Sequence, residues 1–546
     1  SVRPSRRTNI RRRCFSNYAA GLIATTRILI RQSAPKATAK YCGKLRSNWH
    51  ENTWGIMTAP FKLTRIPSLK TPEAFRAHVA SLRVEIPCDD AIITEASPVA
   101  EPLAGITING KTIGNRIALQ PMEGWDGTTD GHATDAVRRR WRRFGESGAK
   151  LICGAEAMAV RPDGRANPNQ LLINSDTKGD LSELREILLA AHREKFGSTG
   201  DLAIGFQLTH SGRFCRPNEK FTYEPRVAYR HPILDEKFKV ASDAQVWSDD
   251  ELAGLIGDYV KAARLAREVG ADFIDLKCCH GYLLHEFLGA FTRAGRYGGS
   301  FENRTRLFRE IVAGIRADGN DLDLGVRLSL FDIVPHRPNP AAALPGKLGP
   351  GIPEAHETPF PYQFGVNKND PTQPDLTETF AFVRLCGELG IKLLNTSAGS
   401  PYYNPHIQRP AAYPPSDGYQ PAYDPLVDVA RQIDAVRQVK GQLPEGMAVV
   451  SSALSYLQEY LPHVSQALLR EGWTDFAGLG RMVLSYPDIL AAAMGQGALE
   501  KRLICRTFSD CTTAPRNGLP SGCFPLDDYY SKSPEAAELK AKKKAG

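Results

Sequence analysis

Short apolar runs alternate with longer amphipathic stretches from about residue 105 to residue 500, and this alternation constrains the possible folds more than any other feature. A short apolar run is typical of a buried strand, and a helix between two such strands makes them parallel. Eight runs are present, at residues 116–120, 150–154, 202–207, 272–277, 323–327, 391–395, 447–450 and 475–479. Eight repeats predict a closed (β/α)₈ TIM barrel, an α/β fold.

The segments between these runs carry helix signals. Residues 248–269 begin with Ser248 followed by three acidic residues, which is the pattern of a capped helix N-terminus. The main rival is an open doubly wound sheet, which normally has a GxGxxG turn after its first strand, and the sequence contains no such turn. The NG and GN turns of TINGKTIGNR, residues 107–116, predict a small hairpin that closes the bottom of the barrel.

The net charge of +9 is concentrated in residues 1–56, which hold nine Arg and three Lys against the single acid Glu51. The rest of the chain carries a net −2, which gives no general attraction to nucleic acid. The basic segment is interpreted as a mitochondrial-type transit peptide, as a disordered tail, or as sequence upstream of a true start at Met57. We therefore expect a basic segment at 1–56, an N-terminal extension at 57–104, the barrel at 105–500 and a C-terminal tail at 501–546.

No stretch approaches the roughly 20 consecutive apolar residues that a membrane-spanning helix needs. Several of the 11 cysteines lie in apolar strand-like runs, where they serve as small core residues, and this suits a reducing compartment. We expect a cytoplasmic protein without a membrane or nucleic-acid partner, and the sequence leaves its oligomeric state open. The run RRRWRR, residues 138–143, is interpreted as the solvated face of the first barrel helix.

Two segments rich in proline follow the fifth and sixth apolar runs. Residues 331–374 are far longer than an ordinary connection of roughly 2–6 residues. Loops after barrel strands surround the catalytic face, so this segment is interpreted either as a lid over the substrate or as a surface insertion. Residues 408–424, rich in proline and tyrosine, are expected to join it.

Candidate site residues follow from the rule that reactive groups in a TIM barrel stand at the carboxyl ends of its strands. After the first four runs come PMEGW (121–125), AEA (155–157), QLTHSGR (207–213) and KCCHGYLLHEF (277–287). Arg327 ends the fifth run, and SSALS (451–455) and GLGRM (478–482) follow the last two. Small residues in these last loops let the backbone approach a phosphate closely, and this is the usual phosphate position in the fold.

With these residues in place, the chain resembles the old yellow enzyme family of FMN-binding NADH:flavin oxidoreductases, which is related to 2,4-dienoyl-CoA reductase. The resemblance covers about residues 105–500. It rests on four motifs in the family's order, NRIALQPM, QLTHSGR, HGYLLHEFL and YGGSFENRTRLFREI. Four ordered motifs are far more specific than one short pattern.

The resemblance implies a role for each matching residue. The flavin-lining group is Pro121, Met122 and Glu123, with Ala157 behind the ring, Gln207 at its pyrimidine edge, and Ser452, Ala453, Gly480 and Arg481 at its phosphate. Arg327 would face flavin N1, where a fixed guanidinium stabilises the negative charge of the reduced ring. Lys277 and His280 would polarise a substrate carbonyl, and Tyr282 would protonate the substrate carbon, because a phenol stays protonated at neutral pH.

Two positions depart from the family pattern. Lys277 stands where the family usually has His, and Glu123 stands where it usually has Thr, Cys or Ala. Because an isolated buried charge is costly, we expect these two residues to form an ion pair across the mouth of the site. The departures also suggest a substrate that carries its own charge. Trp125 is expected in the substrate wall, with a core position as the alternative.

The C-terminal cysteines invite a comparison with two-domain relatives, which carry a [4Fe–4S] cluster on a C-x2-C-x3-C-x11-C run. Cys505, Cys511 and Cys523 keep the last interval but provide only three thiolates and the wrong first interval. We expect no iron–sulfur cluster and no other metal. Electrons would then come from NADH or NADPH that docks directly above the flavin.

The leading interpretation is an enzyme of the ene-reductase type, in which NAD(P)H reduces FMN and the flavin delivers hydride to a small substrate with a carbonyl-conjugated alkene. One alternative is an oxidative flavin dehydrogenase that acts on an amine or an alcohol. A further alternative is a non-catalytic flavin-binding protein descended from an enzyme. The intact Tyr282 and Arg327 favour the enzyme.

Overall fold

A computed structural model describes residues 62–346 and 348–545, and the expected basic segment at 1–56 lies outside these residues. Eight parallel strands follow one another around a barrel in the order β12, β11, β8, β7, β6, β4, β3 and β13. A parallel bridge between Val450 and Phe476 links the two ends of this order, so the barrel is nearly closed. The predicted TIM barrel is confirmed.

Each of the eight predicted apolar runs forms a barrel strand. The strands are β3 (Ile117–Leu119), β4 (Leu151–Ile152), β6 (Ala203–Thr209), β7 (Phe273–Cys278), β8 (Asp323–Ser329), β11 (Ile391–Ser397), β12 (Ala448–Val450) and β13 (Ala477–Leu479). A short extra strand, β5 (Ala157–Ala159), pairs in parallel with the second half of β6. Strands that are buried on both faces show continuous rather than alternating apolar patterns, and this is why they could be recognised.

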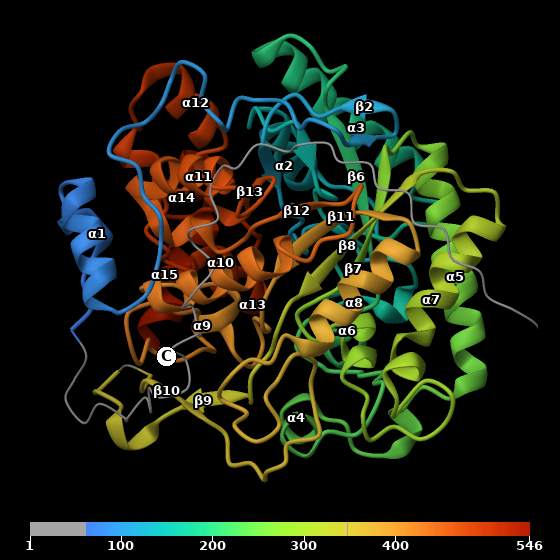
Figure 1. The fold of residues 1–546 in the computed structure, drawn as a ribbon. Helices are drawn as coiled ribbons and strands as arrows, with labels where there is room; N and C mark the ends of the chain where they lie inside the picture. The colour runs from blue at the N-terminus through green and yellow to red at the C-terminus, as the bar shows by residue number, and fades with distance from the viewer. Residues whose placement is uncertain (1–61, 347, 546) are drawn as a thin grey trace, which may run out of the picture. The chain divides into compact units, whose positions relative to one another are not determined.

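Helices cover the outside of the barrel between successive strands (Figure 1). They are α2 (Asp135–Gly145), α3 (Lys178–Phe196), α5 (Asp249–Glu268), α7 (Phe301–Ala317), α8 (Thr377–Glu388), α10 (Leu426–Lys440), α11 (Leu461–Arg470) and α12 (Ile489–Gln496). The predicted cap of α5 is present, since Ser248 and Glu251 form a capping box. Helices α5 and α7 lie side by side on the barrel surface (Figure 1).

The predicted hairpin is also present, as antiparallel strands β1 (Thr107–Ile108) and β2 (Lys111–Thr112). Ile108 and Ile113 are fully buried and pack with Phe273 and Phe476 inside the barrel. The hairpin therefore closes the barrel at the end opposite the catalytic loops. A larger apolar core fills the space between the strands and the helices.

Shorter elements lie in the connections between the barrel strands and helices and in the two terminal segments. They are α1 (Pro72–Ser81), α4 (Pro232–Phe238), α6 (Leu283–Leu288), α9 (Pro405–Gln408), α13 (Asp510–Arg516), α14 (Asp528–Ser531), α15 (Pro534–Ala545) and the hairpin of β9 (His336–Pro338) with β10 (Gly351–Pro353). Helix α1 belongs to the N-terminal extension, where Phe75 stacks on Tyr460 with ring centroids 4.4 Å apart. Extension, barrel and C-terminal tail belong to one compact unit.

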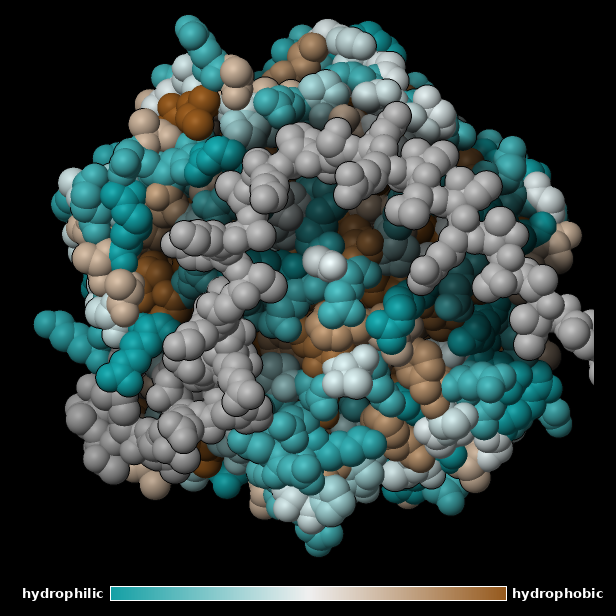
Figure 2. Space-filling model, viewed as in Figure 1, coloured by the Kyte–Doolittle hydropathy of each residue, from teal (hydrophilic) through white to brown (hydrophobic). Residues whose placement is uncertain are grey.

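Hydrophilic residues cover most of the described surface on the face shown in Figure 2. The large exposed hydrophobic side chains are Phe221, Leu344, Tyr413 and Tyr529, which lie in separate parts of the sequence. Among residues 62–346 and 348–545, no helix has the length and apolar character required to cross a membrane.

Candidate functional site

A cavity of about 1250 Å³, its open mouth included, lies at the carboxyl ends of the barrel strands. Its walls come from the loops that follow β3, β7, β11, β12 and β13, from Arg327 within β8, and from the C-terminal tail. The predicted site residues on these walls are Pro121, Met122, Glu123, Trp125, Lys277, His280, Tyr282, Arg327, Ser452, Ala453, Gly480 and Arg481. The residues that the strand-end rule selected therefore lie together in the structure, although they are up to 360 positions apart in the sequence.

Ala157 and Gln207 do not line the cavity. They are partners in the parallel register of β5 and β6, directly behind it. Gln207 is fully buried, and its Nε2 donates a hydrogen bond of 2.5 Å to Oδ2 of Asp275. The second polar atom of the Gln207 side chain, Oε1, is buried without a hydrogen-bond partner.

Glu123, Lys277 and Tyr282 form one compact cluster in the cavity. The Lys277 ammonium donates to Oε1 of Glu123, so the predicted ion pair is confirmed. The Tyr282 hydroxyl donates to the second carboxylate oxygen, Oε2, at 2.5 Å. The ammonium also lies 3.6 Å from the centroid of the Tyr282 ring, which adds a cation–π contact. Exposures of 4% for the Lys277 side chain and 11% for that of Glu123 show that the pair is nearly desolvated.

The environment of Tyr282 favours its protonated form. Burial and the adjacent Glu123 carboxylate raise the pKa of Tyr282 well above that of a free phenol. The Tyr402 hydroxyl lies 2.9 Å from the Tyr282 hydroxyl and extends the polar chain by one more group. Tyr282 therefore keeps its proton at neutral pH.

His280 is held in the left-handed region of the backbone, with φ of +64°. The Ser329 hydroxyl accepts a 2.9 Å hydrogen bond from the His280 amide, and the Ser397 hydroxyl lies 2.7 Å from His280 Nε2. A non-glycine residue keeps such a backbone only where its surroundings determine it. Burial and the charges of Arg327 and Lys277 lower the pKa of His280 well below that of a free imidazole, so the ring is neutral.

Arg327 is fixed in place by the loop after β3. It donates to the carbonyl oxygen of Pro121 at 2.7 Å and to Oε1 of Gln120 at 3.1 Å. Its Nε is buried without a partner. A buried guanidinium nitrogen with no acceptor is costly unless a ligand completes the site, so this part of the cavity fits an electron-rich ring edge.

The loops after β12 and β13 form the far end of the cavity. Ala453 has φ of +66°, and a Cβ atom built on Gly480 would meet nothing within 4 Å, so the Gly480 backbone borders open space. Arg481 has no hydrogen bond or ion pair with any residue of the described chain. Exposed backbone and an uncompensated guanidinium are the groups that bind a phosphate. The cavity thus offers the two cationic groups that FMN requires, Arg327 for the ring edge and Arg481 for the phosphate.

Several cavity residues were not predicted. Tyr402 and Ser397 come from the end of β11, and the strand-end rule would have identified them had it been applied to that strand. Arg409, Arg516 and Ser521 come from a proline-rich loop and from the tail, where no motif marked them. A signal for the missing residues therefore existed at the end of the sixth run, and none existed in the tail.

The interpretation of RRRWRR as a solvated helix face is wrong for its central residues. Arg140 and Trp141 of α2 are buried, and Arg140 binds Oε1 of Glu156 at 2.5 Å and a carboxylate oxygen of Asp126. Arg140 also lines the cavity. Helix α2 therefore carries a charged residue on its buried face, which is tolerated because two carboxylates neutralise the guanidinium.

The described residues of segment 331–374 do not line this cavity, so in this structure the segment does not cover it. The second proline-rich segment, residues 408–424, does contribute to the cavity wall, through Gln408, Arg409 and Pro410. The C-terminal tail contributes as well: the Ser521 amide donates to Asp126 at 2.8 Å, and its hydroxyl donates to the Gly124 carbonyl.

The three tail cysteines are free thiols, and Cys511 lines the cavity. Within the described ranges no group of three or more His, Cys, Asp or Glu side chains is arranged to hold a metal ion. Three thiols without that arrangement do not fit a [4Fe–4S] cluster, which needs four ligands.

Residues 103–340 match the family model described as the NADH:flavin oxidoreductase / NADH oxidase family. An NADH:flavin oxidoreductase of Gibberella zeae is 25% identical over 424 residues, which cover 75% of this chain and 89% of that protein. NADPH dehydrogenases of Geobacillus sp. and Bacillus subtilis are each 32% identical and match 42% of this chain. The match spans 63% of each of these two dehydrogenases, less than two thirds of their length.

Solved structures with the same barrel include three oxidoreductases. A 2-naphthoyl-CoA reductase has a TM-score of 0.56 at 17% identity and matches 80% of this chain and 57% of that one. Histamine dehydrogenase from Rhizobium sp. 4-9 has a TM-score of 0.55 at 18% identity, with 80% and 53% matched. An old yellow enzyme homologue from Zymomonas mobilis has a TM-score of 0.50 at 20% identity, with 74% and 94% matched. At these identities the similarity supports the fold.

Proposed function

Because this chain belongs to the NADH:flavin oxidoreductase family, we propose that its barrel cavity binds FMN and that the protein uses NADH or NADPH to reduce a carbonyl-conjugated alkene. Arg327 would hold the ring edge, and Ser452, Ala453, Gly480 and Arg481 would hold the phosphate. Bound FMN would supply two-electron chemistry, taking hydride from the nicotinamide and giving it to the substrate.

One observation carries this proposal, which is the arrangement of Tyr282, Lys277 and His280 in a single cavity with Arg327. Tyr282 is a buried phenol with a raised pKa, so it has a proton to donate to a substrate carbon. Neutral His280 and the ammonium of Lys277 are hydrogen-bond donors for the carbonyl oxygen of the substrate. Hydrogen bonding to that oxygen stabilises the enolate-like charge that develops there.

The Glu123–Lys277 pair revises the expectation of a charged substrate. The carboxylate and the ammonium neutralise each other within the cluster, so the two departures from the family pattern add no net charge to this part of the cavity. An uncharged enone is therefore compatible with this cluster. Specificity for charge, if the substrate has any, arises elsewhere in the cavity.

Anaerobic stopped-flow mixing tests the proposal. NADH or NADPH should bleach the flavin absorbance of the purified protein, and 2-cyclohexenone should then restore it. Tyr282→Phe should leave the bleaching intact and slow the restoration by about 10²- to 10⁴-fold, the usual contribution of a general acid. Equal restoration rates in Tyr282→Phe and the unmodified protein would contradict the role of Tyr282.

A second candidate is oxidation of an amine or alcohol, and the Glu123 carboxylate is the observation that favours it. This carboxylate accepts a hydrogen bond of 2.5 Å from the Tyr282 hydroxyl, so the same cluster contains a base that could accept a proton leaving a substrate. Bleaching of the flavin by an amine or alcohol, and by neither nicotinamide, would favour this candidate. A flavin that stays oxidised with every donor would instead favour a non-catalytic flavin-binding protein.

A further inference from the structure

A second cavity lies beside the first, among the loop after β11, the C-terminal tail and the start of α10. Its volume is about 690 Å³ with its mouth included. Seven prolines line it, at positions 401, 405, 410, 414, 415, 421 and 425, so we call it the proline cavity. Apolar walls of this kind are usual for small-molecule sites that hold a few well-placed polar groups.

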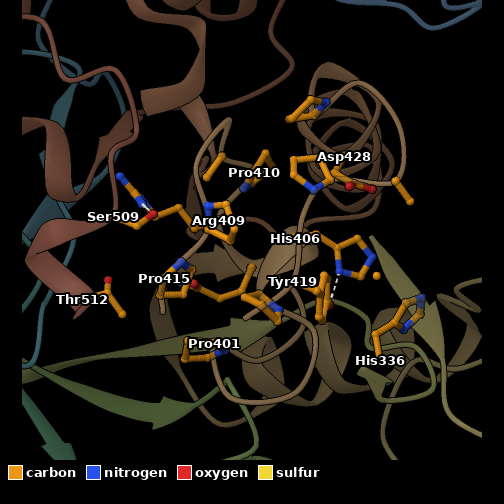
Figure 3. A pocket seen from close by; sticks show the side chains of 18 of the residues that line it. His336, Pro401, His406, Arg409, Pro410, Pro415, Tyr419, Asp428, Ser509 and Thr512 are labelled. Atoms are coloured by element: carbon orange, nitrogen blue, oxygen red, sulfur yellow. Dashed lines mark hydrogen bonds between the residues drawn. The ribbon is translucent and has the colours of Figure 1, made fainter. Parts of the chain in front are cut away.

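Polar side chains occupy two opposite sides of the proline cavity. Figure 3 shows Arg409, Ser509 and Thr512 on one side, with His406 and His336 on the other. The two imidazoles are neutral, since burial lowers the pKa of His336 to about 4 and that of His406 far below its ordinary value. The carboxylate that lines the cavity, Asp428, is paired with Arg431 at 3.0 Å, so the unbalanced positive charge lies on the side of Arg409.

Arg409, Arg481 and Arg516 line both cavities and form the partition between them. Asp417 neutralises Arg516 in an ion pair. Arg409 contacts only neutral groups, the Ser509 hydroxyl at 3.1 Å and the Cys505 sulfur at 3.9 Å. Burial and the charges of Arg409 and Arg516 lower the pKa of Arg481 to about 10. The partition thus carries two guanidinium groups that no carboxylate of the described chain balances.

Two hydrogen-bond donors on this side of the cavity have no partner. Arg409 Nε and the Thr512 hydroxyl are buried without a hydrogen bond, and Thr512 is only 8% exposed. Buried polar atoms in native proteins are normally satisfied, so unmatched donors beside an unbalanced charge indicate an absent acceptor. An anion would satisfy both donors and would also balance the charge of Arg409.

We propose that the proline cavity binds a small aromatic monocarboxylate. The carboxylate group lies against Arg409 and Thr512, with the guanidinium and the hydroxyl as donors. The ring of the ligand packs against Pro410, Pro415 and Tyr419.

The single negative charge of the proposed ligand follows from the charge balance of the partition. This step rests on the proposed function, because the FMN phosphate on the other side would neutralise Arg481. One unbalanced guanidinium, that of Arg409, then remains for the proline cavity, and a monoanion matches it. A phosphate ester would bring a second charge that the neutral His336 and His406 do not balance.

Isothermal titration calorimetry on the full-length holoprotein tests the site with benzoate as the probe and benzyl alcohol as its uncharged counterpart. Benzoate should bind, and benzyl alcohol should bind at least about tenfold more weakly. Arg409→Gln should raise the benzoate Kd about tenfold or more, and Thr512→Val about fivefold. Arg502→Gln is the matched control: this tail arginine is 81% exposed and paired with Glu500, so its removal should change nothing.

Flavin absorbance, recorded in each titration, separates this proposal from the proposed function. Benzoate in the proline cavity should leave the flavin spectrum unchanged, whereas benzoate stacked over the flavin would shift it and overturn the proposal. Loss of flavin from Arg409→Gln would also overturn it, because Arg409 would then serve the phosphate. If Arg409→Gln fails to fold, Thr512→Val decides. A preparation without any flavin contradicts the proposed function, while its response to benzoate still reports on this site.

Discussion

At the scale of single residues, the buried Glu123–Lys277 pair has the clearest consequence for stability. Glu123→Thr and Lys277→His should each destabilise the protein, because each leaves the other charge buried and unpaired. The double variant should recover part of the loss, with a coupling energy of about 1–3 kcal/mol. Urea unfolding of the four proteins measures it. The same cycle on the exposed pair Asp528–Lys532, with side chains 82% and 74% exposed, should give less than about 1 kcal/mol. Equal coupling in the two cycles would contradict this prediction.

Asp275 should make stability depend on pH. Burial raises its pKa to about 7, above the roughly 3.9 of an unfolded chain. A raised pKa means that this carboxyl favours the folded state when protonated, so its contribution is full below about pH 4 and is lost as the pH rises through 7. Asp275→Asn removes the carboxyl that titrates. As the pH rises from 4 to 8, the variant should therefore gain stability relative to the unmodified protein, and urea unfolding measures this difference.

Asp318, whose side chain is 15% exposed, provides a control of opposite sign. Its hydrogen bonds with Arg264 lower its pKa, so its contribution is present above the unfolded pKa and is lost as the pH falls. Asp318→Asn should therefore lose relative stability as the pH rises above 4. A difference between Asp275→Asn and the unmodified protein that stays flat from pH 4 to 8 would contradict the assignment to Asp275.

Site residues that follow barrel strands were predictable, whereas residues brought in by tertiary packing were not. Lys277, His280, Tyr282 and Arg327 stand next to apolar runs that the sequence displays. Arg409 lies in an irregular loop, and its position at the cavity depends on how the tail packs against that loop. No local pattern encodes such a contact, because its partner is about a hundred residues away.

At the scale of elements, the barrel strands were found because burial on both faces leaves continuous apolar runs. Strands β5, β9 and β10 were not predicted. Each has only three residues, and β5 exists because Ala157–Ala159 meets the far half of β6. Pairing of this kind comes from the neighbouring strand rather than from local propensity.

The packing of α2 on α3 depends on Gly145. A Cβ atom there would lie 2.2 Å from the Leu188 carbonyl oxygen and 2.9 Å from the Ala191 Cβ, so the two helices would have to separate. Gly145→Ala should lower the free energy of unfolding by about 1–3 kcal/mol. Gly254→Ala on α5 is the control, since a Cβ there meets nothing within 4 Å, and it should stabilise by about 0.5–1 kcal/mol. Thermal unfolding measures both, and equal effects would contradict the close packing.

At the scale of the whole molecule, flavin binding and stability should be linked. Walls of the cavity come from the barrel and from the tail, so a ligand that contacts both should stabilise the folded chain. Free FMN at about 100 times its Kd should add about 2.7 kcal/mol to the flavin-free protein. Arg481→Gln should need a higher FMN concentration for the same rise in Tm, and Arg502→Gln should not. A Tm independent of FMN would contradict the assignment of the cavity.

The fold of the whole molecule followed from eight repeats, but the role of residues 501–545 did not, because the sequence drew attention only to their cysteines. Helix α13 instead brings Thr512 and Arg516 to the barrel mouth, and the connection between α13 and α14 brings Ser521 there. A tail without apolar periodicity gives no sign of the surface on which it packs.

The contact of Ser521 with Gly124 and Asp126 has a consequence for biosynthesis. It joins positions 397 and 395 residues apart in the chain. A ribosome adds about 5–20 residues per second from the N-terminus, so all eight strands emerge before the tail does. The tail residues that line the cavity, Ser521 among them, are not yet made during that interval. Because the tail supplies part of the cavity wall, the complete cavity forms only after Ser521 has been synthesised.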